Sequence, residues 1–159
     1  MGIKPDITVK VSYLLDEEDG PFNMQSNVCF VEAEVVVRPY LRGALERLSK
    51  NFQLVLFTAA EPAYADAIMQ HIDPFNKYFD ARLYRQHCIE THYSADWGSS
   101  YIKDLRIIGN RRLQDLLIVD NAVLCFSLQL SNGIPVLPLL GWSKTSAATG
   151  HSLSSFDEV

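Results

Sequence analysis

The chain has 159 residues, of which 48% are hydrophobic and 21% are charged. A chain of this length and composition forms one domain that buries about two-thirds of its unfolded surface, which excludes disordered, collagen-like and repeat proteins. The formal net charge of −5 argues against a general nucleic-acid-binding surface. No apolar run reaches the roughly 18 residues that a membrane span requires.

The three cysteines, Cys29, Cys88 and Cys125, fit neither a disulfide framework nor a zinc site. They are typical of core residues in a reducing, intracellular compartment. The first 20 residues carry five acidic side chains and two lysines, which is unlike a basic transit peptide. The sequence therefore favours a nuclear or cytoplasmic location over a mitochondrial one.

The first half of the chain predicts a hairpin followed by a strand, a helix and a second strand. Residues 7–13 and 28–37 alternate apolar and polar side chains, and the acidic segment between them ends in Gly20-Pro21, so the two runs form a hairpin with a long loop. The later elements are a helix that starts at Arg38-Pro39, an apolar strand over 53–58, a helix over 62–71 and a short strand over 79–84.

The second half predicts a helical turn over 103–109, an apolar strand over 116–119 and a short strand over 134–137. Apolar strands that alternate with helices form βαβ units in a largely parallel sheet. We expect an α/β domain over residues 1–142 and a loose tail over residues 143–159, where Ser, Thr, Gly and Ala are frequent.

Polar side chains follow the two apolar strands, at the edge of a parallel sheet where ligands bind. Thr58 ends one strand, and Asp120 with Asn121 ends the other. A hydroxyl can donate to a phosphate oxygen, whereas carboxylate and amide oxygens suit Mg²⁺. Lys103 could neutralise a phosphoryl group, and it belongs to a basic segment, residues 82–112, with six Lys or Arg against three acids. Each of these signals is weak alone.

Their order along the chain resembles the haloacid-dehalogenase superfamily of phosphotransferases. A closer resemblance, over residues 28–142, is to the small C-terminal-domain phosphatase family (Fcp/Scp-like, NLI-interacting-factor-like). It rests on Arg38-Pro39, Leu54-Val55-Leu56-Phe57-Thr58-Ala59, Tyr64-Ala65-Asp66, Ile72-Asp73-Pro74, Arg82 to Cys88, Tyr101-Ile102-Lys103-Asp104-Leu105, Leu116 to Asn121 and Leu130 to Pro135.

The resemblance implies a haloacid-dehalogenase-like Rossmannoid fold, with a largely parallel central sheet flanked by helices and an N-terminal β-hairpin. It also implies Mg²⁺-dependent dephosphorylation of phosphoserine or phosphothreonine proteins through an aspartyl-phosphate. By this resemblance Thr58 binds the phosphoryl oxygens and Lys103 stabilises the aspartyl-phosphate. Arg85 faces the phosphosubstrate, Asp120 and Asn121 hold the metal, and the hairpin borders an apolar substrate groove.

The family's first motif, Asp-x-Asp-x-Thr or Val, is absent from this chain. One interpretation is that residues 7–37 form the substrate-side hairpin and that the catalytic strand is missing. The other is that residues 12–16 are a degenerate first strand, with Asp16 as nucleophile and Glu18 as general acid. In this fold the first strand lies between the strands that end at Thr58 and Asp120, so an empty position exposes two strand edges.

Both interpretations predict little or no phosphatase activity, because a displaced carboxylate alone can cost about 10²-fold in rate. Two alternatives from another class remain open. The chain could bind phosphopeptides without turnover, as a pseudophosphatase. It could also be a binding module that resembles the mitochondrial presequence receptor of the same fold family.

Overall fold

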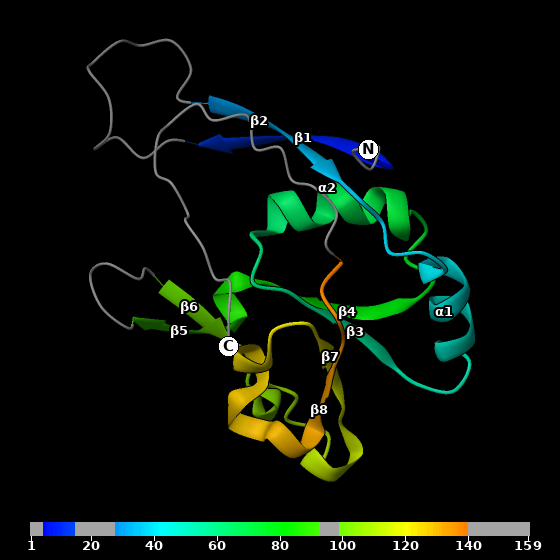
Figure 1. The fold of residues 1–159 in the computed structure, drawn as a ribbon, viewed down its shortest axis with the longest axis vertical. Coiled ribbons are helices and arrows are strands. Elements are labelled where there is room, and N and C mark those ends of the chain that lie inside the picture. Colours follow the sequence, from blue (N-terminus) through cyan, green and yellow to red (C-terminus); the bar gives the residue numbers. More distant parts are fainter. Residues whose placement is uncertain (1–4, 15–27, 93–98, 140–159) are drawn as a thin grey trace.

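The computed structural model describes residues 5–14, 28–92 and 99–139. Figure 1 shows a β-hairpin that lies along helix α2, with two pairs of parallel strands on the other side of that helix. Within the described residues no helix is both long enough and apolar enough to span a bilayer.

The predicted hairpin is confirmed. Strands β1 (Ile7–Leu14) and β2 (Val28–Val35) pair antiparallel along their whole length. The alternation in β1 points Val9 and Val11 inward, where each is 3% exposed, and β1 packs on helix α2 (Pro62–Ile72). Ser12 pairs with Phe30 in this hairpin. Residues 12–14 therefore lie in the hairpin, as the first interpretation of this segment requires.

A βαβ unit follows, as the sequence predicts. Helix α1 (Leu41–Leu48) leads into strand β3 (Leu54–Phe57), which pairs in parallel with β4 (Phe79–Leu83) through α2. Helix α1 begins later than Arg38-Pro39, because Tyr40 takes a left-handed conformation with φ 62° immediately before it. Asp73 ends α2 and accepts the backbone N–H groups of residues 77, 78 and 79, which turns the chain into β4.

The remaining described residues form two small sheets and several 3-10 turns. Strands β5 (Ile89–His92) and β6 (Ser99–Ile102) pair antiparallel, and strands β7 (Ile118–Asp120) and β8 (Gly133–Pro135) pair in parallel. The 3-10 turns are η1 (Arg85–His87), η2 (Leu105–Ile107), η3 (Leu113–Asp115) and η4 (Val123–Asn132). The helical turn expected over 103–109 corresponds to η2, whereas the β5–β6 pair was not predicted.

A small core holds this second region together. Leu105, Ile118 and Phe126 are buried against one another, with Leu116 beside them. Gly133 is required at the start of β8, because a Cβ there would lie 2.1 Å from two carbons of the Phe126 ring. The backbone of Gly133 in β8 therefore packs directly against the Phe126 ring of η4.

Strands β3 and β7 belong to separate two-stranded sheets within the described residues. The sequence predicts that both are buried on both faces, but β3 is half-buried throughout and Val119 in β7 is 61% exposed. Side chains of a strand point to the two faces of its sheet, so these exposures mean that the described residues do not cover both faces of β3 and β7. The α/β character of the fold is clear, whereas the central parallel sheet stays a prediction.

Several predictions fall outside the described residues. These are the loose tail over 143–159 and the two catalytic carboxylates of the second interpretation, Asp16 and Glu18.

Candidate active site

Thr58 lies directly after β3, where the strand continues into the turn before α2. Its backbone N–H donates to the carbonyl oxygen of Leu83, which extends the β3–β4 pairing by one residue. Its Oγ1 accepts the N–H of Ala60 at 3.1 Å. A hydroxyl that accepts one hydrogen bond still carries a proton, which can donate to an oxygen of a ligand.

Arg85 lies beside this turn and is held by it. Its Nε donates to the carbonyl oxygen of Ala59 at 2.8 Å, and its Nη1 contacts a Glu61 oxygen at 2.7 Å. The guanidinium also stacks 5.2 Å from the ring centre of Tyr101 on β6. Because the side chain is 42% exposed, Arg85 combines a fixed position with access from solvent.

A pocket of about 350 Å³ opens next to Arg85. It is lined by Tyr13 from β1, by Ala60, Glu61 and Tyr64 from the start of α2, and by Arg85 itself. Burial raises the pKa of Tyr13, and the negative charge of Glu61 adds to that effect, so the phenol stays neutral at physiological pH. The pocket thus places one tyrosine from the hairpin opposite the cationic side chain of Arg85 in η1.

Lys103 and Asp120 form an ion pair with 2.5 Å between Nζ and Oδ2. Their side chains are 10% and 9% exposed, so the pair lies largely outside solvent. The second oxygen of Asp120 accepts the N–H of Ala122 at 2.8 Å. Both oxygens of this carboxylate are therefore engaged by the chain itself.

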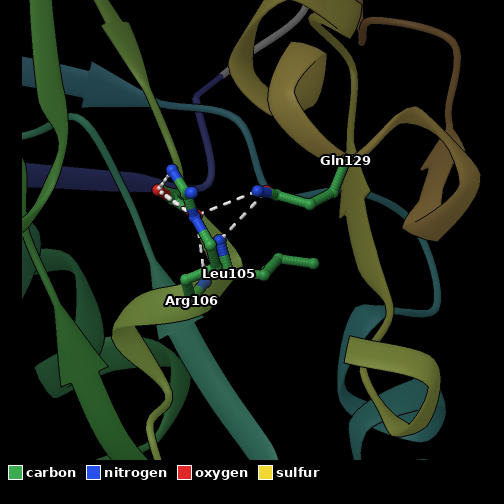
Figure 2. Close-up of polar contacts among 4 residues, drawn as sticks. Leu105, Arg106 and Gln129 are labelled. Carbon is green, nitrogen blue, oxygen red and sulfur yellow. Dashed lines mark hydrogen bonds and ion pairs between the residues drawn. The ribbon is translucent and has the colours of Figure 1, made fainter. Parts of the chain in front are cut away.

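The backbone around Lys103 is fixed by its neighbours. The N–H of Lys103 donates to the carbonyl oxygen of Cys125 at 2.7 Å. Gln129, which is 8% exposed, accepts the N–H of Leu105 at 3.1 Å and donates to Asp104 at 2.9 Å. Figure 2 shows how the Gln129 amide reaches across from η4 to the start of η2. These contacts fix the backbone of residues 103–105. Lys103 is thereby positioned for its ion pair with Asp120, the last residue of β7.

Two cysteines lie between these groups. Cys88 Sγ is 3.8 Å from the carbonyl oxygen of Thr58. Burial raises the pKa of the Cys88 thiol, although the charge of Lys103 opposes that rise. Burial and the charge of Asp120 likewise raise the pKa of Cys125. Both thiols therefore stay protonated at neutral pH and act as small, weakly polar groups.

The described residues do not make a Mg²⁺ site by themselves. Asp120 and Asn121 have suitable oxygens, but the Asp120 carboxylate is already paired with Lys103. Within 5–14, 28–92 and 99–139 no three His, Cys, Asp or Glu side chains come together as metal ligands would. A tightly bound Mg²⁺ would need at least one more carboxylate than these residues supply.

The structure thus brings Thr58 next to Arg85 and pairs Lys103 with Asp120. Asn121 follows on the exposed side, and Asp16 and Glu18 lie outside the described residues. Sequence reasoning missed Glu61 and Gln129. The sequence offers a signal only for Gln129, a single amide within the apolar segment 123–130.

Comparison with known proteins agrees with this geometry. The model of the family described as NLI interacting factor-like phosphatase matches residues 7–156. The chain belongs to this family.

Curated relatives match a little under two-thirds of the chain. CTD small phosphatase-like protein 3 of Caenorhabditis elegans is 40% identical over 102 residues, which are 64% of this chain and 33% of that protein. Nuclear envelope morphology protein 1 of Schizosaccharomyces pombe is 37% identical over 99 residues, or 62% of this chain and 19% of that protein. The chain therefore spans a third or less of the length of these relatives.

A solved structure supports the fold. Fcp1, the fission yeast RNA polymerase II CTD phosphatase, matches with a TM-score of 0.56 and 22% identity, over 82% of this chain and 31% of that chain. The likeness shows a haloacid-dehalogenase-like α/β fold.

Proposed function

We propose that this chain is a protein serine/threonine phosphatase-family domain that binds a phosphoserine or phosphothreonine segment but turns it over slowly or not at all. The finer fold that goes with this proposal is a largely parallel central sheet with β3 and β7 near its middle. Named relatives are CTD phosphatases and a nuclear envelope protein, which supports a phosphoprotein ligand and a nuclear or cytoplasmic location.

The observation that carries the proposal is the direct ion pair between Lys103 and Asp120. Phosphoryl transfer to a carboxylate needs a nucleophilic carboxylate next to a cation that neutralises the developing charge. Here the carboxylate paired with Lys103 among the described residues is Asp120, and both of its oxygens are engaged, by Lys103 and by the N–H of Ala122, so it is poorly placed to act as a nucleophile. The sequence also contains no Asp-x-Asp-x-Thr.

Binding of the phosphate group has better support than its hydrolysis. The turn that begins at Thr58 also holds Arg85, whose guanidinium contacts Ala59 and Glu61 of that turn. Charge-assisted hydrogen bonds to a phosphate are roughly twice as strong as neutral ones. The pocket lined by Tyr13 and Tyr64 would receive an apolar residue near the phosphorylated one.

A peptide-binding experiment tests the proposal. A fluorescent phosphoserine peptide should bind the chain more tightly than its unphosphorylated form, and Arg85→Ala should weaken that binding by about tenfold, as loss of a charged hydrogen bond does. Arg112→Ala is the matched control, since Arg112 is exposed and pairs with Asp115. Equal binding of both peptides would contradict a phosphate-binding role, and preference for a basic amphipathic peptide would favour a presequence-receptor-like module.

A turnover assay tests the second half of the proposal. With an aryl phosphate and Mg²⁺, the chain should release little phosphate above the uncatalysed rate. Appreciable activity that disappears in Lys103→Ala would show that this site is catalytic and that the proposal of slow turnover is wrong.

A further inference from the structure

Glu61 lies at the start of α2, but its side chain does not cap that helix. Its carbonyl oxygen accepts the N–H of Ala65 at 3.0 Å, so the backbone of Glu61 occupies the N-cap position. A polar side chain at this position commonly accepts an N–H of the first turn, yet the Glu61 carboxylate accepts none from the described residues of α2. The carboxylate contacts Nη1 of Arg85 at 2.7 Å instead. The charge of Glu61 therefore acts on Arg85 and contributes little to the helix.

Arg85 is positioned by contacts that do not involve the Glu61 side chain. Its backbone N–H donates to the carbonyl oxygen of Ala60 at 3.0 Å, and its Nε donates to that of Ala59 at 2.8 Å. Its guanidinium stacks 5.2 Å from the ring centre of Tyr101. These contacts fix both the backbone and the plane of the guanidinium, so the Glu61 carboxylate is not needed to hold Arg85 in place.

The donors of Arg85 that stay open to a ligand are limited. A guanidinium can bind two phosphate oxygens through Nε and one terminal nitrogen, or through its two terminal nitrogens. The carbonyl oxygen of Ala59 takes Nε, which leaves the pair of terminal nitrogens. Glu61 already accepts from Nη1, one member of that pair. A phosphate that binds both terminal nitrogens must therefore displace Glu61 or lie against its negative charge.

The charges that line the pocket beside Arg85 are balanced without a ligand. Its lining residues include one cation, Arg85, and one carboxylate, Glu61. Tyr13 adds no charge, because burial and the nearby Glu61 carboxylate both raise the pKa of its phenol. An entering anion makes the pocket net negative. Glu61 thus opposes the binding of any anion that uses Arg85.

We propose that Glu61 is a specificity-determining residue of the phosphate site, which occupies Arg85 in the free chain and is displaced by a phosphate dianion but not by a carboxylate. This proposal rests on the proposed function, since it concerns the phosphate ligand of Arg85. A phosphate brings up to two charges and three strong acceptor oxygens, whereas a carboxylate ligand only exchanges one carboxylate for another. The tethered Glu61 competes at an effective concentration in the millimolar range, above that of a dilute ligand.

Two peptides and one substitution test the proposal. A fluorescent phosphoserine peptide and the same peptide with Glu in place of phosphoserine are titrated with the chain at pH 7.5 and followed by anisotropy. Glu61→Gln should bind the phosphoserine peptide about fivefold more tightly, because a half-exposed ion pair no longer has to be broken. It should also bind the Glu peptide at concentrations where the unmodified chain binds none.

Glu46→Gln is the matched control, since Glu46 is an exposed glutamate that pairs with Lys77 at 3.7 Å. It should leave the affinities for both peptides unchanged. In an Arg85→Ala background Glu61→Gln should change the phosphoserine affinity by less than about twofold, because the donor that Glu61 occupies is then absent. In the unmodified chain, the phosphoserine peptide should shift the carboxyl ¹³C resonance of Glu61 and not that of Glu46.

Weaker binding of the phosphoserine peptide by Glu61→Gln would show that Glu61 positions Arg85, and unchanged binding would show that it does not compete with the ligand. Either result overturns the proposal, while a preference for the phosphorylated over the unphosphorylated peptide still upholds the proposed function. Binding of the Glu peptide by the unmodified chain as tight as that of the phosphoserine peptide would overturn it too. If neither the unmodified chain nor Glu61→Gln binds the phosphoserine peptide, the proposed function and this proposal both fail.

Discussion

The carboxylate of Asp104 fixes the segment that carries Lys103, and its contribution depends on pH. The side-chain hydrogen bonds from Arg106, helped by the Arg106 N–H and by Gln129, outweigh burial and lower the pKa of Asp104 from 3.8 to about 2. Asp104 is protonated more easily in the unfolded chain. It therefore stabilises the fold above about pH 4, and this contribution disappears as the pH falls from about 4 to 2.

Asp104→Asn should lower the free energy of unfolding at pH 7 by about 2 kcal/mol, because a pKa lowered from 3.8 to about 2 corresponds to about 2.4 kcal/mol. Urea titrations between pH 2.5 and 7 should show that the difference from the unmodified chain shrinks toward the acid end. Asp115→Asn is the control, since Asp115 also pairs with an arginine but is 43% exposed, and should change stability by less than about 0.5 kcal/mol. A difference for Asp104→Asn that is the same at every pH would contradict the assignment.

The Lys103–Asp120 pair is the second prediction at this scale. Lys103→Met leaves a carboxylate with 9% side-chain exposure without its cation, and should cost about 3 kcal/mol in urea denaturation. Adding Asp120→Asn should recover part of this loss, because no charge then stays buried. If the single and double variants are equally unstable, the two side chains are not coupled in the folded chain.

The sequence alone predicts Thr58, Lys103 and Asp120 as site residues. Thr58 and Asp120 are polar residues at the ends of apolar strands, and Lys103 belongs to a family motif, and both kinds of signal can be recognised without a structure. It could not show that Lys103 and Asp120 pair directly. That contact depends on the position of η2 relative to β7. Gln129 fixes this position through its hydrogen bond to Asp104, which lies 25 residues earlier in the chain. The metal-binding role of Asp120 and Asn121 stays a prediction, to which the structure adds that both oxygens of Asp120 are engaged by the chain itself.

At the scale of elements, β8 is defined by one close contact. Gly133→Ala should cost about 1–3 kcal/mol or more, because the new Cβ would enter the ring of Phe126, which is 2% exposed and cannot move without disturbing the small core. Gly109→Ala is the matched control, since nothing lies within 4 Å of the position of its Cβ. Thermal unfolding followed by circular dichroism compares the two. Equal midpoints would show that η4 can shift away from β8 freely.

The elements that the sequence predicted are those whose pattern is local. The alternation in β1 and β2 and the apolar run of β3 follow from side-chain periodicity, and the structure confirms the hairpin and the βαβ unit. The β5–β6 pair was missed because Ile-Glu-Thr-His and Ser-Ser-Tyr-Ile carry no such pattern. Their strand conformation comes from pairing with each other, which only the folded chain reveals.

At the scale of the whole molecule, most of the buried apolar side chains among the described residues belong to two regions. One group, between the hairpin and α2, contains Val9, Val11, Ala65 and Met69, and the other, around η2, β7 and η4, contains Leu105, Ile118 and Phe126. Among the described residues no strand pairing joins β3 to β7. Cooperative unfolding requires contacts that couple regions, so these two groups should unfold at different free energies.

Native-state amide exchange at increasing urea should therefore resolve two units, with β3 and β4 in one and β7 and β8 in the other, that differ by about 1 kcal/mol or more. Gly133→Ala supplies the internal check, because it should lower protection in β7 and β8 while β4 is unchanged. A variant effect that spreads equally over both units would show that they already unfold together. In that case contacts between the two regions, such as the hydrogen bond from Arg111 to Gln53, would be enough to couple them.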